Sequence, residues 1–204
     1  MALRPLGINH VEMIFRPGER EAARAFFETM GFAVSDFGPW LVVNVDPENA
    51  NGIDNVMYAS EPVPAQQRFE EELREALGAH DGASAALEHY REVRVAHPQF
   101  NFHFGASLPT REIWEERTGR VREAAADHPL LKGRVDVAVF NPGDPGSVGP
   151  IHQTFLLTEI LSTGTLQTGL IFELQWRPNA PAPGQMDLGK MASTATYPDP
   201  SSIV

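Results

Sequence analysis

The sequence predicts an α+β protein in which one module is used twice. Two stretches carry this prediction: residues 8–15 and 99–105 place His10 and His103 in strand patterns, and a helix pattern follows each. Because successive side chains of a strand face opposite sides, each histidine lies opposite an apolar face. Short strand patterns then follow both helices, so the order of elements repeats. We therefore expect the two histidine strands to hold matching positions and to face each other.

The first module is expected to cover residues 1–62. After its first strand, residues 19–30 have apolar side chains at helical spacing, and Gly31 suits the position that follows a helix. Pro62 ends the last strand pattern. The module is therefore predicted as strand, helix and three strands, with the later strands at 32–36, 40–45 and 55–60.

The rest of the chain divides into three parts. Residues 63–97 fit neither module and are predicted as a helical insert with two amphipathic helices. The second module, residues 98–177, begins with the strand of His103. Residues 178–204 are rich in proline and lack a period, which predicts an extended or disordered tail. In the second module a helix is predicted at 111–126, and strands at 134–140, 153–161 and 166–176.

Composition excludes several classes of function. The 204 residues carry a formal net charge of −11, and Lys and Arg do not cluster, which argues against nucleic acid and anionic membranes as partners. The chain has no cysteine, so any metal must be bound by nitrogen and oxygen. The sequence has no apolar run long enough for a signal peptide or a membrane span. We expect a cytoplasmic enzyme or binding protein.

Three residues form the candidate metal site. His10 and His103 come from the first strands of the two modules, and Glu173 from the last strand of the second, on the face expected for His103. Two imidazoles and a carboxylate leave positions open for substrate, water or dioxygen and suit Fe(II) or another divalent ion. Alternatively, the histidines are hydrogen-bonded structural residues and Glu173 is solvated on an open sheet face. The matching module positions favour the metal site.

His152 is the candidate catalytic acid or base. It follows a loop rich in glycine and proline, residues 141–150, and begins a strand. Such a loop can carry an acid/base group over a cavity. The alternative is a histidine on a surface loop. Glu12 shares the predicted face of His10 and could orient a ligand imidazole, or it could be solvated at the rim.

Two runs of the first module, INHVE at residues 8–12 and AARAFFETMGF at 22–32, resemble the opening of the vicinal oxygen chelate superfamily. This superfamily includes glyoxalase I, bleomycin-resistance proteins and extradiol dioxygenases. The second module is similar through His103 and residues 172–174. The resemblance implies paired βαβββ modules whose curved mixed sheets enclose a shared cleft. By position it implies that His10, His103 and Glu173 are metal ligands.

The chain departs from two patterns within this superfamily. Glyoxalase-type members carry a further carboxylate on the last strand of the first module, where alignment of the two modules on their final prolines places Met57. Methionine does not replace a hard oxygen ligand, which counts against glyoxalase I activity. Extradiol dioxygenases also use a histidine and a tyrosine near the substrate. His152 could supply the first, but the turn before Leu166 offers Thr163 and no tyrosine.

Three functional hypotheses remain open. The first is a metal-dependent enzyme acting on a small oxygen-chelating substrate with an aromatic or hydrophobic body, as a ring-cleaving dioxygenase or as a lyase or isomerase. Fe(II) is the expected ion, with Mn, Zn or Ni as alternatives. The second is a metal-free small-molecule-binding protein of the bleomycin-resistance type. The third is a catalytically silent module that associates through the insert and tail, with a homodimer as the simplest assembly.

Overall fold

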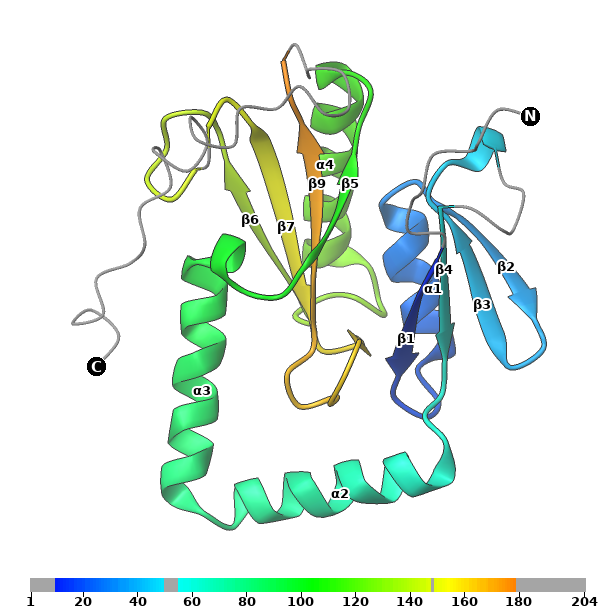
Figure 1. Ribbon diagram of the computed structural model, residues 1–204, viewed down its shortest axis with the longest axis vertical. Helices are drawn as coiled ribbons and strands as arrows, with labels where there is room; N and C mark the ends of the chain where they lie inside the picture. Colours follow the sequence, from blue (N-terminus) through cyan, green and yellow to red (C-terminus); the bar gives the residue numbers. More distant parts are fainter. Residues whose placement is uncertain (1–9, 50–54, 148, 179–204) are drawn as a thin grey trace, which may run out of the picture.

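The computed structural model describes residues 10–49, 55–147 and 149–178, and it confirms the α+β fold of two βαβββ modules (Figure 1). The first module comprises β1 (His10–Phe15), α1 (Arg20–Thr29), β2 (Ala33–Phe37), β3 (Trp40–Asn44), the 3-10 helix η1 (Pro47–Asn49) and β4 (Val56–Ser60). The second comprises the 3-10 helix η2 (Pro98–Phe100), β5 (Phe104–Ser107), α4 (Arg111–Asp127), β6 (Val135–Phe140), β7 (His152–Thr158), β8 (Leu161–Ser162) and β9 (Leu170–Trp176).

Each module forms a mixed sheet in which the first and last strands are parallel neighbours. The first sheet has the order β2-β3-β4-β1-β8, and the second has the order β5-β9-β7-β6. β1 pairs with β4, and β5 with β9, in the same parallel sense. The short strand β8 of the second module pairs antiparallel with β1. The second module therefore completes the sheet of the first.

One hydrophobic core runs through both modules. Helices α1 and α4 cover the sheets (Figure 1), and Arg120 Nη2 of α4 donates to the carbonyl of Glu28 in α1 at 3.0 Å. The rings of Phe32 and Phe172, one from each module, meet edge to face with centroids 5.5 Å apart. Both side chains are buried in the same cluster. A smaller cluster lies on the opposite face of the second sheet and consists of Phe155, Leu157 and Ile171.

The expected insert consists of two helices, α2 (Pro64–Gly78) and α3 (Asp81–Ala96), which meet at a sharp bend (Figure 1). Two buried charged side chains attach the insert to the segment between β8 and β9. Glu70 accepts a hydrogen bond from the amide of Leu166 at 3.0 Å, and Arg94 donates to the carbonyl of Thr168. Since buried charges need partners, these contacts fix the insert against the second module.

The second histidine strand is shorter than expected. Pro98 begins the 3-10 turn η2, which is closed by hydrogen bonds from Asn101 to Pro98 and His97. A proline suits the first position of a helical turn because it lacks an N–H. β5 therefore begins only at Phe104, and His103 lies directly before it.

The strands expected at 153–161 and 166–176 are also interrupted. Thr158 Oγ1 accepts a hydrogen bond from the amide of Ile160, which ends β7. Gly169, with φ of +60°, precedes the start of β9. The predicted tail lies outside the described residues from 179 onward. Within the described parts, no helix combines the length and apolar character that crossing a membrane requires.

Candidate functional site

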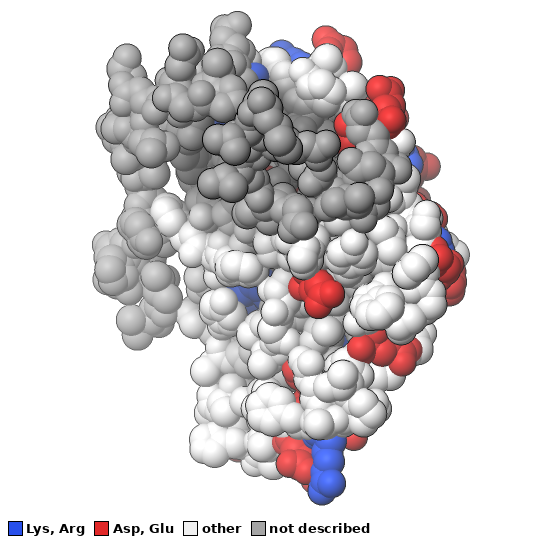
Figure 2. Space-filling view, turned by 45° about the vertical axis from the view of Figure 1, so that its right-hand side comes forward, with Lys and Arg blue, Asp and Glu red and all other residues white. Residues whose placement is uncertain are grey.

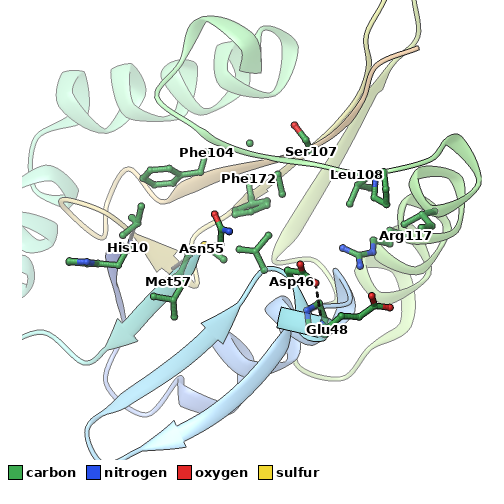
Figure 3. Close-up of a pocket in the computed structure, with 18 residues that line it drawn as sticks. His10, Asp46, Glu48, Asn55, Met57, Phe104, Ser107, Leu108, Arg117 and Phe172 are labelled. Atoms are coloured by element: carbon green, nitrogen blue, oxygen red, sulfur yellow. Dashed lines mark hydrogen bonds between the residues drawn. The ribbon is translucent and has the colours of Figure 1, made fainter. Parts of the chain in front are cut away.

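A cleft of about 910 Å³ lies between the two modules (Figure 3). The first module contributes the starts of β1 and β4 and the segment after β3. The second contributes β5, the loop after it, one side of α4 and Phe172 of β9. The position agrees with the expected shared cleft. Its apolar lining includes Val11, Met57, Phe104, Leu108, Ile113 and Phe172.

His10 begins β1 and is exposed at the cleft. Its ring contacts the ring of Tyr58 edge-on, with centroids 5.7 Å apart. Figure 3 shows the imidazole directed away from Arg117, which lies on the opposite side of the cleft. Glu12 is exposed and pairs with Tyr58 in the ladder between β1 and β4. His10, Glu12 and Tyr58 therefore share the face that points away from α1.

The strand registers correct the alignment of the two modules at Met57. Met57 pairs with Val11, as Phe172 pairs with Phe104, and both pairs pack into the main core. Glu173 pairs with Gly105, one residue further along. Its counterpart in the first module is therefore Tyr58, and the expectation that Met57 holds that position is wrong by one residue. Alignment on the final prolines fails because it ignores which side chains face the helix.

His103 and Glu173 form a close pair beside β5. His103 Nε2 lies 3.4 Å from Glu173 Oε2, and His103 Nδ1 lies 2.7 Å from the carbonyl oxygen of Asn101. Glu173 is only 4% exposed, and its Oε1 accepts a hydrogen bond from Gln153 Nε2 at 2.7 Å. The contact with Glu173 raises the pKa of His103, against the opposing effect of burial.

The partners of the imidazole define what the pair can bind. A carbonyl oxygen only accepts, so Nδ1 carries a hydrogen and Nε2 is left facing the Glu173 carboxylate. Nε2 must then either carry a proton or share a cation with that carboxylate. Two ligand atoms at roughly 2.1 Å from one ion lie about 3.0 Å apart in octahedral and about 3.4 Å apart in tetrahedral geometry. The observed 3.4 Å between Nε2 and Oε2 fits two ligands of one ion.

Gly105 provides the space in which this pair sits. A Cβ atom at residue 105 would lie 3.0 Å from Glu173 Oε2 and 3.2 Å from Gln175 Nε2. Gly105 also lines the cleft, whereas neither His103 nor Glu173 is among the lining residues. The glycine therefore serves close packing and not a left-handed backbone.

The structure brings together two of the three expected metal ligands. His103 and Glu173 are adjacent, whereas His10 belongs to the other module. Among the described residues, no group of three or more His, Asp or Glu side chains is arranged to hold a metal ion. The assignment of His10, His103 and Glu173 as ligands therefore stays a prediction, and the geometry favours the pair from the second module.

His152 lies apart from the cleft and from the His103–Glu173 pair. It pairs with Trp176 in the ladder between β7 and β9, on the face that α4 covers. Its ring lies between those of Trp114 and Trp176, with centroids 5.1 Å away in both cases, and Nδ1 lies 3.1 Å from Asn141 Oδ1. Burial lowers the pKa of His152, and the charge of Arg111 acts in the same direction. This placement does not support the expected position over a cavity.

Arg117 is a cleft residue that sequence reasoning did not identify. It lies on α4 within the apolar stripe of the predicted helix, and its half-buried guanidinium lines the cleft. Burial lowers its pKa, with a further contribution from the charge of Arg120. A basic residue inside an apolar helical stripe is a detectable signal. Which wall of which cleft it would reach depends on how the modules pack.

Comparisons with known proteins yield structural likenesses at low identity. The chain is similar to the oxidase ChaP-H1, with 16% identity and a TM-score of 0.41 over 87% of this chain and 100% of that one. It is also similar to a glyoxalase/bleomycin resistance protein/dioxygenase from Alicyclobacillus acidocaldarius, with 11% identity and a TM-score of 0.43 over 85% and 93% of the two chains. A protein of the same description from Nocardioides shares 9% identity, with a TM-score of 0.39 over 91% and 92%. No protein-family model and no curated protein matches the sequence.

Proposed function

We propose that the protein is a metal-dependent enzyme of the vicinal oxygen chelate type that acts on a small molecule bound in the cleft between the modules. One observation carries the proposal. His103 presents Nε2 to the buried carboxylate of Glu173 at 3.4 Å, while Asn101 and Gln153 occupy the outer atoms of the pair. Outer hydrogen bonds of this kind orient the side chains that bind a metal.

His103 and Glu173 supply two donor atoms that suit a divalent first-row ion. An imidazole nitrogen and a carboxylate oxygen suit Fe(II), Mn(II), Zn(II) and Ni(II). His103 and Glu173 would hold the ion, and His10 is the candidate third ligand from the other module. Such an ion supplies Lewis-acid polarisation of substrate oxygens. The chain itself contributes an apolar wall that removes water from the substrate body, as expected of a small-molecule site.

Metal content of the full chain tests this proposal. We expect about one equivalent of Fe(II) after anaerobic reconstitution of protein purified without chelator, measured by elemental analysis. Loss of an outer partner of a metal ligand already costs about 10- to 100-fold in affinity. His103→Ala and Glu173→Ala should therefore each cost at least that much, and His89→Ala on the exposed surface of α3 is the matched control. His10→Ala shows whether the third ligand comes from the first module.

Turnover provides the second part of the test. Catechol-type substrates and 2-oxo or 2-hydroxy carbonyl compounds separate dioxygenase chemistry from lyase or isomerase chemistry. At least one class should react with the reconstituted protein, and Glu173→Ala should abolish that reaction.

A metal-free small-molecule-binding protein is the second candidate. It is favoured by the largely apolar lining of the cleft, which includes neither His103 nor Glu173. This alternative prevails if the wild-type protein takes up no divalent ion and binds apolar ligands as tightly as Glu173→Ala does.

A further inference from the structure

Arg117 brings a positive charge into a cleft whose lining is largely apolar. Among the described lining residues it is the one Arg or Lys. The chain as a whole has a formal net charge of −11, and in Figure 2 acidic side chains gather along one side of the visible face while basic ones are scattered. A half-buried guanidinium in such a protein calls for an anionic partner.

The guanidinium is held in place by its surroundings. A Cβ at Gly31, where φ is +80°, would lie 3.1 Å from Arg117 Nε, so the backbone after α1 packs directly against the guanidinium. On another side, Cζ lies 5.9 Å from the centre of the Phe32 ring. Because arginine presents a planar set of donors, a guanidinium fixed in this way is organised to bind a carboxylate through two parallel hydrogen bonds.

Among the described residues Arg117 forms no hydrogen bond and no ion pair within 4.0 Å, although, against the larger effect of burial, the charges of Glu116 and Asp46 raise its pKa. Asp46 and Glu48 lie across the cleft (Figure 3), and Asp46 Oδ1 accepts a hydrogen bond from the amide of Glu48 at 3.1 Å. The five donors of the guanidinium are therefore available to a ligand. The two nearby carboxylates disfavour a doubly charged phosphate more strongly than a singly charged carboxylate.

We propose that the cleft binds an organic acid whose carboxylate pairs with Arg117 and whose apolar body packs against Phe104, Leu108 and Phe172. This inference rests on the proposed use of the cleft as the small-molecule site and names the substrate class. The metal binding proposed at His103 and Glu173 rests on other residues and other observations. The two can therefore fail independently.

The test uses three probes that share one aromatic body: 2-naphthoate, 2-naphthylmethanol and 2-naphthyl phosphate. Their dissociation constants are measured by calorimetry on the full chain. Arg117→Met removes the charge and keeps an unbranched apolar side chain for packing. Arg122→Met makes the same change at an exposed position of α4 outside the cleft and is the matched control. Thermal melts verify that both variants are folded.

We expect the wild-type protein to prefer 2-naphthoate over both other probes. A hydrogen bond to a charged group contributes about 1.5–3 kcal/mol, which corresponds to about a 10- to 150-fold loss of 2-naphthoate affinity in Arg117→Met. Binding of 2-naphthylmethanol should change little, and Arg122→Met should match the wild type with all three probes. Arg117→Met should also keep the metal stoichiometry of the wild type.

Three outcomes would overturn the inference. Equal affinity for 2-naphthoate and 2-naphthylmethanol, unaffected by Arg117→Met, would show that the cleft does not select an anion. Tighter binding of 2-naphthyl phosphate would contradict the choice of a carboxylate. Binding of no probe would reject the cleft as a small-molecule site. In contrast, selective binding of 2-naphthoate by a protein that takes up no metal would support this inference and reject the metal-dependent function.

Discussion

Gly105 controls the approach of β5 to the polar pair of the second module. A methyl group at this position would lie 3.0 Å from Glu173 Oε2, a tighter contact than most Cβ atoms make, so the buried Glu173 side chain would have to shift. We expect Gly105→Ala to lower the free energy of unfolding by about 1–3 kcal/mol, the usual cost of overpacking. Urea denaturation measures the change, and metal uptake by the same variant should fall.

Gly119 supplies a control of opposite sign. It lies within α4, and no atom comes within 4 Å of a Cβ built there. Gly119→Ala should therefore raise stability by about 0.5–1 kcal/mol, because alanine favours the helix. If Gly105→Ala were stabilised in the same way, the close contact with Glu173 would be refuted.

His152 should make the protein less stable in mild acid. Its pKa is lowered in the folded state by burial between Trp114 and Trp176. The unfolded chain, with a histidine pKa of about 6.5, then binds more protons than the folded chain, so stability falls as the pH falls below that value. Urea midpoints between pH 8 and 5 should fall more steeply for the wild type than for His152→Gln. Parallel curves would contradict the lowered pKa.

The candidate site could be predicted from the sequence only in part. The alternation of side chains along strands predicts that His103 and Glu173 share a face, and the structure brings them together although His103 lies just before β5. The position of His10 relative to this pair depends on how two modules pack, which no periodicity encodes. The position of Arg117 in the cleft could not be predicted for the same reason. Met57 was misplaced because the register of β1 and β4 depends on pairing and not on the position of a later proline.

At the level of elements, long periodic segments were predicted well and interruptions were not. α1 and α4 lie within one residue of the predicted bounds, since their apolar spacing continues over several turns. The 3-10 turn η2 replaced the start of a predicted strand because local hydrogen bonds from Asn101 closed it. The two-residue strand β8 exists through its pairing with β1, a contact distant in sequence.

The attachment of the insert to the second module should depend on the buried carboxylate of Glu70. Glu70 is 4% exposed and accepts from the amide of Leu166, so Glu70→Ala leaves that amide buried without a partner. We expect a loss of about 1–3 kcal/mol in the free energy of unfolding and faster hydrogen exchange at Leu166. Glu75→Ala, at an exposed position of the same helix, should have little effect on either measurement. Similar behaviour of the two variants would argue against attachment through Glu70.

The whole molecule should unfold as one unit because the core is shared. Phe172 of the second module packs against Phe32 of the first. Truncation of a buried phenylalanine costs about 3–5 kcal/mol. Calorimetry of Phe172→Ala should therefore show a single unfolding transition with a lower midpoint temperature. Phe69→Ala, at a side chain that is 53% exposed on α2, should shift it little. Two transitions, of which Phe172→Ala moves only one, would show that the modules are independent.

The pairing of β8 with β1 also has a consequence during synthesis on the ribosome. The last strand of the first module ends at Ser60, but the strand that covers the edge of β1 ends at Ser162. About 100 residues must be added between them, which takes roughly 5–20 s at 5–20 residues per second. During that interval the nascent first module has an uncovered strand edge, which is a template for pairing with other chains. The insert, synthesised in the same interval, thus lengthens the period in which neighbouring nascent chains on one messenger RNA can join through β1.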